Sequence, residues 1–399
     1  MNILKKKNKI IRLFSFCFMS LLMGTTFIGC DGFNSSSEEK QENLVDFTIE
    51  VENDSPTVLQ LTDTQVQVQI REGESGDPNK LNLANMETAC FQYIRQAIEN
   101  SQPDLILMTG DNTYGKYDDD GNGLEELVTF MDSFKIPWAP VFGNHDAECI
   151  LGVDWQCSLF EESEYCLFKQ RELSGNGNYT VGLSYQGNLI RVFYMMDTNG
   201  NGQMSWESME NGHTVRANGL QYDQIEWFET DIKKIRANNP DTKFSIAMHI
   251  PPMIFTKALE QYGYDANIAD DKTNPFILNL DTYADTNEGD FGYIGGATDA
   301  WKFWDEKYEF WNTVKTNGVD SIFVGHNHVN TASIVYEGVR LSYGLKTGLY
   351  DQANYRLQDG TIKGSWNWLE GTPIVGGTVI NLLQDGTIDN IYHAYHQNA

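Results

Sequence analysis

Five short motifs in this 399-residue chain carry side chains that commonly bind metal ions. They are Thr-Asp-Thr-Gln at Asp63, Gly-Asp-Asn-Thr-Tyr at Asp111, Gly-Asn-His-Asp at Asn144, Met-His at His249, and Gly-His-Asn-His at His326 and His328. Together they supply two carboxylates, a carboxamide and several imidazoles. Such a set suits two metal ions that share one bridging carboxylate, an arrangement that acts on phosphate esters. The motifs therefore predict a metal-dependent phosphoesterase.

Each motif taken alone has a structural explanation. Asp63 and Asp111 occur in sequences typical of turns, and a lone His249 would more often be a core histidine. However, the chain holds only seven histidines, and four of them fall in these motifs: His145, His249, His326 and His328. Chance does not account for that concentration, so the metal site is the favoured interpretation.

The motifs follow short apolar runs. Runs at 58–61, 105–108, 244–248 and 321–324 end immediately before, or within a step of, a candidate metal ligand. Strands that are buried on both faces have this composition. Apolar residues at helical spacing between 86 and 98, and again between 225 and 235, predict helices that alternate with these strands. We therefore expect a layered α/β sheet whose loops gather at one edge.

The amino terminus has the layout of an export signal. Five basic residues precede an apolar run of sixteen residues, from Leu13 to Ile28. The run ends in Phe27-Ile28-Gly29-Cys30, which resembles the lipobox of bacterial lipoproteins, where the cysteine is acylated and becomes the first residue. A membrane helix is the alternative, but a span needs about 20 apolar residues. We expect residues 1–29 to be a signal peptide and Cys30 to carry the lipid.

Composition divides the remaining chain into a tether and one catalytic domain. Residues 30–45 are rich in Ser, Glu, Lys and Gln, which predicts a flexible lipid-anchored segment. Residues 46–399, in a chain that is 41% hydrophobic, are enough for one large core. An acidic insertion at about 260–300 interrupts this domain. We expect an exported protein, anchored by lipid at the bacterial cell surface or periplasmic face.

Charge excludes some partners. The five basic residues of the signal, subtracted from 28 Lys and Arg, leave 23 against 56 acidic residues, a net charge of −33. Such a field repels nucleic acid and anionic lipid surfaces, so we expect no nucleic acid partner. No protein partner is evident. The field also repels phosphate esters, so the charge of bound metal has to overcome it.

Two further features leave alternatives open. Three cysteines, Cys149, Cys157 and Cys166, lie within eighteen residues, which predicts one disulfide of undetermined pairing in an exported protein. In the acidic insertion, four aromatic residues could stack on an aromatic leaving group or could pack the insertion onto the domain. They are Tyr262, Tyr264, Phe291 and Tyr293.

The motif series resembles that of the calcineurin-like metallophosphoesterase superfamily, over residues 57–350. The stretches 137–146, 249–252 and 324–330 are most similar to the purple-acid-phosphatase-related branch of plants and yeasts. The resemblance implies an α/β fold, a layered β-sandwich flanked by helices, with a dimetal site at the carboxyl ends of strands. It also implies a small phosphate-ester substrate.

The resemblance assigns a role to each motif residue. Asp63 and His328 would hold the first metal ion, and Asp111 would bridge the two ions. The second ion would be held by Asn144, His249 and His326. A hydroxide that bridges the ions would attack a phosphomonoester. His145, oriented by Asp146, would protonate the leaving group.

One position departs from the family pattern. The first motif usually reads Asp-x-His, whereas here it is Asp63-Thr64-Gln65, so a ligand is missing or is replaced by the Gln65 carboxamide oxygen. Tyr114 offers a substitute, because Gly-Asp-x-x-Tyr in purple acid phosphatases supplies a tyrosinate that binds ferric iron. The metals would then be Fe with Zn or Mn. If Tyr114 only packs, two divalent ions such as Mn or Zn are expected.

Two other functions remain open at this stage. Phosphodiester hydrolysis could use the same residues. A catalytically inactive surface binding lipoprotein is the alternative that Gln65 and the adverse charge suggest. The Asn144-His145-Asp146 sequence favours an enzyme, because His145 has no evident use in a scaffold.

Overall fold

The computed structural model describes ten ranges of the chain. They are residues 44–67, 83–117, 120–200, 207–210, 213–216, 219–265, 276–277, 289–295, 309–365 and 371–395. Asn43–Ala399 form one compact unit. The predicted signal peptide, Cys30 and nearly all of the predicted tether lie outside the described residues.

A seven-stranded mixed sheet forms one half of the unit. Its strands run in the order β1-β5-β6-β9-β12-β14-β13. The pairs β6·β9, β9·β12 and β12·β14 are parallel. Their bounds are β1 Phe47–Val51, β5 Tyr179–Tyr185, β6 Asn188–Met195, β9 Lys243–Ala247, β12 Ser321–Val324, β14 Val339–Tyr343 and β13 Ser333–Tyr336. The carboxyl ends of these parallel strands therefore lie at the same edge of the sheet.

A five-stranded sheet forms the other half, in the order β19-β18-β2-β3-β4. Here β2, β3 and β4 are parallel, while β18 and β19 are antiparallel additions. The bounds are β19 Ile388–Tyr395, β18 Gly376–Leu382, β2 Thr57–Leu61, β3 Leu105–Thr109 and β4 Trp138–Val141.

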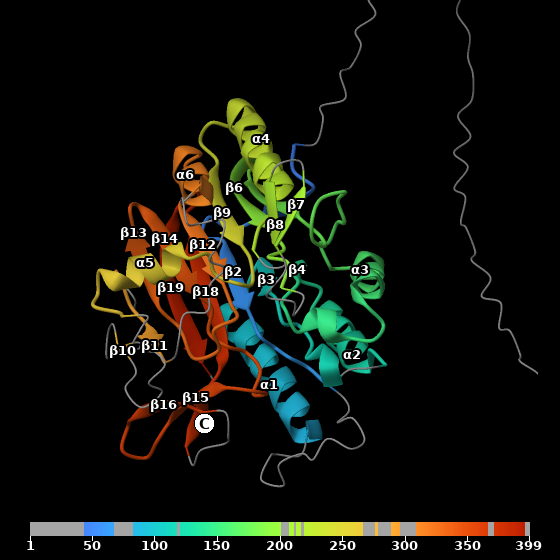
Figure 1. Ribbon diagram of the computed structural model, residues 1–399, viewed down its shortest axis with the longest axis vertical. Coiled ribbons are helices and arrows are strands. Elements are labelled where there is room, and N and C mark those ends of the chain that lie inside the picture. Colours follow the sequence, from blue (N-terminus) through green and yellow to red (C-terminus); the bar gives the residue numbers. More distant parts are fainter. Residues whose placement is uncertain are drawn as a thin grey trace, which may run out of the picture. The chain divides into compact units, whose positions relative to one another are not determined.

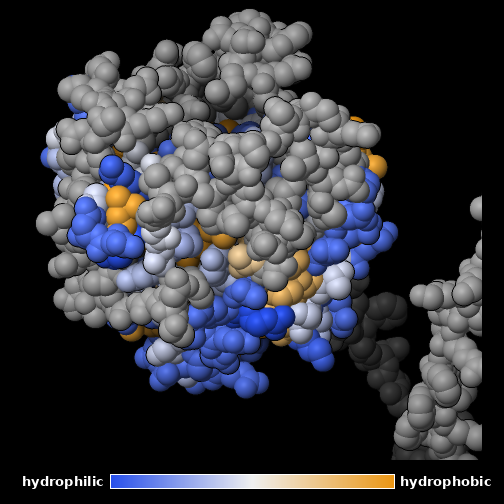
Figure 2. All heavy atoms as spheres, turned by 90° about the horizontal axis from the view of Figure 1, so that it is seen from below, coloured by the Kyte–Doolittle hydropathy of each residue, from blue (hydrophilic) through white to orange (hydrophobic). Residues whose placement is uncertain are grey.

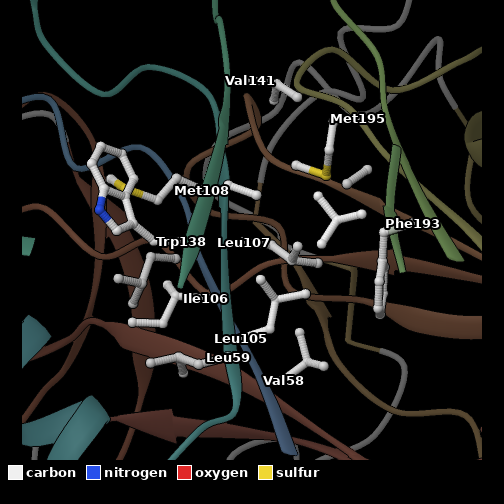
Figure 3. Close-up of a cluster of buried hydrophobic side chains, with 14 of the residues drawn as sticks. Val58, Leu59, Leu105, Ile106, Leu107, Met108, Trp138, Val141, Phe193 and Met195 are labelled. Carbon is white, nitrogen blue, oxygen red and sulfur yellow. The ribbon is translucent and has the colours of Figure 1, made fainter. Parts of the chain in front are cut away.

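The two sheets pack through alternating apolar side chains (Figure 3). Val58, Leu105 and Leu107 of the five-stranded sheet lie on the side of Phe193 and Met195 of the seven-stranded sheet, and all belong to one buried cluster. Residues between them in sequence, such as Ile106 and Met108, lie on the opposite side of their strand. Every residue of β3 is buried, which explains its continuous apolar sequence.

Helices cover the outer faces of both sheets (Figure 1). The cluster between the sheets extends to α1, α2 and α3, whereas a second cluster joins the other face of the seven-stranded sheet to α4, α5 and α6. The bounds are α1 Leu83–Ser101, α2 Asn122–Asp132, α3 Val153–Glu162, α4 Tyr222–Asn238, α5 Ile254–Glu260 and α6 Glu309–Thr316, with 3-10 turns η1 Gly115–Tyr117 and η2 Asp146–Glu148. The predicted sandwich flanked by helices is confirmed, as are the four predicted strands and both predicted helices.

Three small sheets complete the described structure. One has the order β16-β15-β17, and the other two are the pairs β10·β11 and β7·β8. Their bounds are β16 Ile362–Ser365, β15 Ala353–Arg356, β17 Thr372–Ile374, β10 Phe276–Ile277, β11 Tyr293–Ile294, β7 Glu207–Glu210 and β8 His213–Arg216.

The aromatic residues of the acidic insertion pack onto the domain. Tyr264, Phe291 and Tyr293 are buried, and Tyr262 is half-buried with its hydroxyl donated to Asp290. The packing alternative is therefore the correct one for the buried three. Most of the insertion, 266–275, 278–288 and 296–308, lies outside the described residues.

The described surface is mainly hydrophilic. Figure 2 shows one face on which apolar patches are small and separate. Among the described residues, the exposed large hydrophobic side chains are Ile150, Leu151, Val335 and Leu383. None of the described helices is both long and apolar enough to span a bilayer.

The predicted disulfide is wrong. Cys157 and Cys166 are free thiols, and neither is joined to Cys149, although the structure describes all three. All three are buried. Burial raises the pKa of the Cys157 thiol to about 12, so this group stays a neutral, inert core side chain.

His393 of β19 ties the five-stranded sheet to the loop after β12. It is 1% exposed, its Nε2–H donates to the Thr331 carbonyl at 2.8 Å, and its Nδ1 accepts from the Thr378 hydroxyl at 2.9 Å. Burial lowers its pKa from the usual 6.5 to about 4. The neutral ring is therefore the form that the fold holds beside the His326–His328 loop.

This burial makes stability depend on pH. Because the folded pKa lies below the unfolded one, the unfolded chain takes up more protons between about pH 6.5 and 4. The contribution of His393 is thus complete above pH 6.5 and falls by about 3 kcal/mol by pH 4. We expect the free energy of unfolding, measured in urea, to fall more steeply over this interval in the wild type than in His393→Gln. Parallel pH profiles would contradict this account.

Candidate metal centre

Parallel strands from both sheets end at one site. Asp63 follows β2, Asp111 follows β3 and Asn144 follows β4, all in the five-stranded sheet. His249 follows β9, and His326 and His328 follow β12, in the seven-stranded sheet. The structure brings all six predicted ligands together because the carboxyl ends of these strands meet where the sheets face each other.

Four residues of the site have backbone angles in the left-handed region. The φ values are 51° for Asp63, 47° for Gln65, 52° for Asp111 and 71° for His326. Non-glycine residues with such angles cost roughly 1–3 kcal/mol each and cluster at functional sites. The strain turns these side chains back toward the centre immediately after their strands.

Two glycines permit this close approach. A Cβ at Gly143 would lie 2.2 Å from Asp111 Oδ1, and one at Gly325 would lie 2.0 Å from the Thr62 hydroxyl. Neither gap leaves room for a side chain. The glycines that precede Asn144 and His326 in their motifs are therefore required by packing around the carboxylates.

The position formed by Asp111, Asn144, His249 and His326 fits a cation well. His249 Nδ1–H donates to the Thr109 carbonyl at 2.8 Å, so Nε2 is the nitrogen left to bind an ion. That Nε2 lies 3.2 Å from Asn144 Oδ1 and 3.3 Å from Asp111 Oδ1. His326 Nδ1 lies 2.8 Å from the same Asn144 oxygen. Converging oxygen and nitrogen lone pairs of this kind suit Zn, Mn or Fe.

A second position lies between Asp63 and His328. Asp63 Oδ1 is buried and faces the imidazole of His328. His328 Nε2 lies 3.2 Å from it, while His328 Nδ1 faces Asp351 at 3.5 Å. One ligand atom each from Asp63, Asp111 and His249 lie within 4.8 Å of one another. A carboxylate oxygen and an imidazole nitrogen that face each other in this way form a place that a cation can occupy.

Electrostatics at the centre already favours positive charge beside the carboxylates. Burial opposes ionisation of Asp63, but His328, His249 and Lys346 lower its pKa to about 2. Burial likewise opposes charge on His249, whereas Asp111 raises the pKa of that imidazole to about 9. The pKa of Asp111 is lowered in turn, against the effect of burial, by His249 and His145.

Gln65 does not present its oxygen to the centre. Lys346 Nζ donates to Gln65 Oε1 at 2.7 Å, and Gln65 Nε2 lies 3.3 Å from both Asp111 Oδ2 and His328 Nε2. In this arrangement the amide presents an N–H, which cannot coordinate a metal ion, and ligation by the Gln65 carboxamide oxygen stays a prediction.

Tyr114 stacks on His145. The ring centroids are 4.1 Å apart with an angle of 20° between the planes, and Tyr350 meets Tyr114 edge-on at 4.9 Å. These ring contacts support the packing role of Tyr114. Ligation of iron by the Tyr114 hydroxyl stays a prediction.

His145 is oriented by Glu148, not by Asp146. His145 Nδ1 lies 3.0 Å from Glu148 Oε2, one turn along the chain. The Asp146 carboxylate instead accepts from the Gly143 and Thr113 amides at 2.7 and 2.9 Å. Burial and the nearby Asp111 charge raise the Asp146 pKa to about 7. Asp146 thus holds two metal-site loops together, and its predicted contact with His145 is absent.

Sequence reasoning missed three residues. Glu148 had a signal, because an acid three residues after a histidine can reach it across one turn. Asp351, which faces His328, and Lys346, which faces Gln65, lie in a loop without a recognisable motif. Only the folded backbone brings that loop beside Asp63.

The structural role of Asp146 can be tested by unfolding. Asp146→Ala leaves the Gly143 and Thr113 amides buried without an acceptor, at a cost of about 1–3 kcal/mol each. We expect a lower urea midpoint. Glu148→Ala is the matched control: its side chain is exposed, so its free energy of unfolding should fall by less than about 0.5 kcal/mol. An Asp146→Ala protein as stable as the control would contradict this role.

Relatives of the chain carry phosphatase names. Probable inactive purple acid phosphatase 29 of Arabidopsis thaliana is 24% identical over 299 residues, 66% of this chain and 64% of that protein. Probable inactive purple acid phosphatase 28 of the same plant is 43% identical over 104 residues, 23% and 26% of the two chains. Phosphatase DCR2 of Saccharomyces cerevisiae is 34% identical over 110 residues, 27% and 18%. The chain thus spans less than two thirds of each relative.

Matches to solved structures have low identities and low TM-scores. A dimetal phosphatase from Danio rerio has a TM-score of 0.44 and 12% identity, with 85% of this chain and 99% of that chain covered. Purple acid phosphatase PPD1 from yellow lupin has a TM-score of 0.37 and 14% identity, with 86% and 54% covered.

The sequence profile of the calcineurin-like phosphoesterases matches residues 56–330. This range contains the strand ends and all six predicted ligands described above, and it is more than half of the chain. The chain belongs to the calcineurin-like phosphoesterase family, with relatives in its purple-acid-phosphatase branch.

Proposed function

We propose that this protein is a metal-dependent phosphatase that hydrolyses small phosphate monoesters. The observation that carries the proposal is the placement of His145 at the rim of the metal centre. Its side chain is 18% exposed, whereas that of Asp111 is 1% exposed, and the two approach to 4.0 Å. His145 is thus the group between solvent and the buried ligands, where a leaving group departs.

The chain holds His145 in place from three sides. Its backbone N–H donates to Asp111 Oδ1 at 2.9 Å, Glu148 accepts from Nδ1, and the ring of Tyr114 stacks on the imidazole. With Nδ1–H donated to Glu148, Nε2 is directed away from that carboxylate and can give a proton to a leaving alkoxide. A bound metal would polarise the phosphate and acidify a water molecule.

Two alternatives have specific support. The same residues could act on phosphodiesters, since nothing in the ligand set distinguishes the two esters. A catalytically inactive binding protein is suggested by the Gln65 amide, which turns its N–H toward the ligands, and by relatives named as probable inactive phosphatases. The similarity to Phosphatase DCR2 supports the enzyme.

Replacement of His145 separates catalysis from metal binding. We expect His145→Ala to lower turnover of para-nitrophenyl phosphate by about 10²- to 10⁴-fold, the usual contribution of a general acid. Metal content, measured by elemental analysis, should not change, because His145 is not a proposed ligand. Asn144→Ala, beside it, should lose metal and turnover together.

Three results would change the functional assignment, and the colour of the protein decides the role of Tyr114. Equal turnover by the wild type and His145→Ala would reject the mechanism. Faster hydrolysis of bis-para-nitrophenyl phosphate than of the monoester would favour the diesterase. Metal binding without turnover of either ester would favour the inactive binding protein. A violet colour with bound iron would assign Tyr114 as a ligand, and colourless active protein would remove it.

We also propose that the protein is exported and carries a lipid on Cys30. Support comes from the basic, apolar and Gly-Cys succession of residues 1–30. Expressed in bacteria with labelled palmitate, the wild type should incorporate label and partition into detergent, whereas Cys30→Ala should do neither. A labelled Cys30→Ala protein would place the lipid elsewhere, and an unlabelled wild type would reject the anchor.

A further inference from the structure

Lys346 is buried directly behind the Asp63–Gln65 motif. It is 1% exposed and lies between β14 and β15. Its neighbours are docked on the motif by backbone hydrogen bonds, from Thr347 N to Thr62 O at 2.9 Å and from Gly348 N to Asp63 O at 3.1 Å. The lysine is therefore held in place by the fold.

The Lys346 ammonium fixes the orientation of the Gln65 amide. It donates to Gln65 Oε1 at 2.7 Å and to the Asp63 carbonyl at 3.1 Å. Because an ammonium can only donate, the amide oxygen must face it. The reversed amide would set an NH₂ group against the ammonium and an oxygen against Asp111 Oδ2, which is unfavourable at both ends.

The amide nitrogen consequently occupies the side of the first metal position. Gln65 Nε2 lies 3.3 Å from Asp111 Oδ2 and 3.3 Å from His328 Nε2, the two atoms that an ion beside Asp63 would use. The Gln65 N–H groups donate to the Asp111 and His328 lone pairs that an ion would need. The positive charge of Lys346 lies on the other side of the amide. Asp63 Oδ1, 3.2 Å from His328 Nε2, is the carboxylate oxygen that an ion there would still reach.

The other position is formed by oxygen and imidazole nitrogen atoms. Asn144 Oδ1, His249 Nε2 and His326 Nδ1 converge there with Asp111 Oδ1. The Thr109 carbonyl sets His249 so that its lone pair faces inward.

We propose that Gln65 and Lys346 make the two metal positions unequal. One divalent ion binds tightly to the Asp111, Asn144, His249 and His326 set. The ion beside Asp63 and His328 binds weakly and exchanges, because a hydrogen-bond donor and a lysine charge replace its third protein ligand. This inference deepens the proposed function and rests on it, since both concern one centre.

Titration with Mn²⁺ tests the inference without turnover. Full-length protein in detergent is titrated with Mn²⁺, and the unbound ion is followed by its electron paramagnetic resonance signal. We expect the wild type to bind one ion tightly and a second with a dissociation constant at least about a hundredfold higher. Two ions of similar affinity in the wild type would overturn the proposal.

Three variants locate the cause. The double variant Gln65→His, Lys346→Met should bind the second ion at least about tenfold more tightly. Lys346→Met alone should act in the same direction, because the released amide can turn its oxygen toward the ion. Lys257→Met, at a lysine that is 43% exposed, is the matched control and should match the wild type. The tight ion, retained in every variant, shows that the centre is folded. An unchanged second affinity in both Lys346 variants would overturn the proposal.

Turnover of para-nitrophenyl phosphate by the same samples separates the two proposals. Unequal binding with no turnover keeps this inference and rejects the phosphatase. Equal binding with turnover keeps the phosphatase and rejects this inference.

Discussion

Two buried carboxylates set the central constraint on this structure. Asp63 is 1% exposed and Asp111 is fully buried, and each offers a ligand atom within 4.8 Å of the other. Two negative charges so close in a medium of low polarity repel each other strongly and lose their hydration. Positive charge must therefore lie beside them in every state of the protein. The imidazoles, Lys346 and the metal positions all place positive charge beside these carboxylates.

The fold meets the requirement by joining two sheets at their strand ends. The five-stranded sheet delivers both carboxylates and Asn144, and the seven-stranded sheet delivers the imidazoles of His249, His326 and His328. Most groups that face the carboxylates therefore come from the opposite sheet, whereas His145 follows β4 of the same sheet. The apolar contact in Figure 3 between β3 and β6 is what holds the two sets of loops in register. It must also offset the left-handed backbone at Asp63, Asp111 and His326.

Much of this could be predicted from the sequence, and the failures have physical causes. A continuous apolar run such as 105–108 specifies a doubly buried strand, and the polar residue after it specifies a strand-end site. The carboxylate that contacts His145 could not be predicted in this way, because Asp146 and Glu148 are both near it in sequence. The 3-10 turn from Asp146 to Glu148 determines that Glu148 makes the contact. The orientation of the Gln65 amide depends on Lys346, which is 281 residues away in the sequence. The predicted disulfide failed because buried thiols can serve the core without pairing.

The charge of Lys346, which is part of the chain, and the charge of a metal ion, which binds from solution, have different roles. Lys346 donates hydrogen bonds to the Asp63 carbonyl and the Gln65 oxygen and is 1% exposed, so its charge is fixed beside the Asp63–Gln65 motif and closed off from solvent. The Lys346 charge can offset the charge of the carboxylates, but it cannot contact a phosphate group. His249 faces Asp111 directly, and a metal ion that binds its Nε2 takes the place of any proton there. The position beside His249 and Asn144 is thus where an ion can serve both the buried carboxylate and a substrate, while the position backed by Lys346 already has part of its charge supplied by the fold.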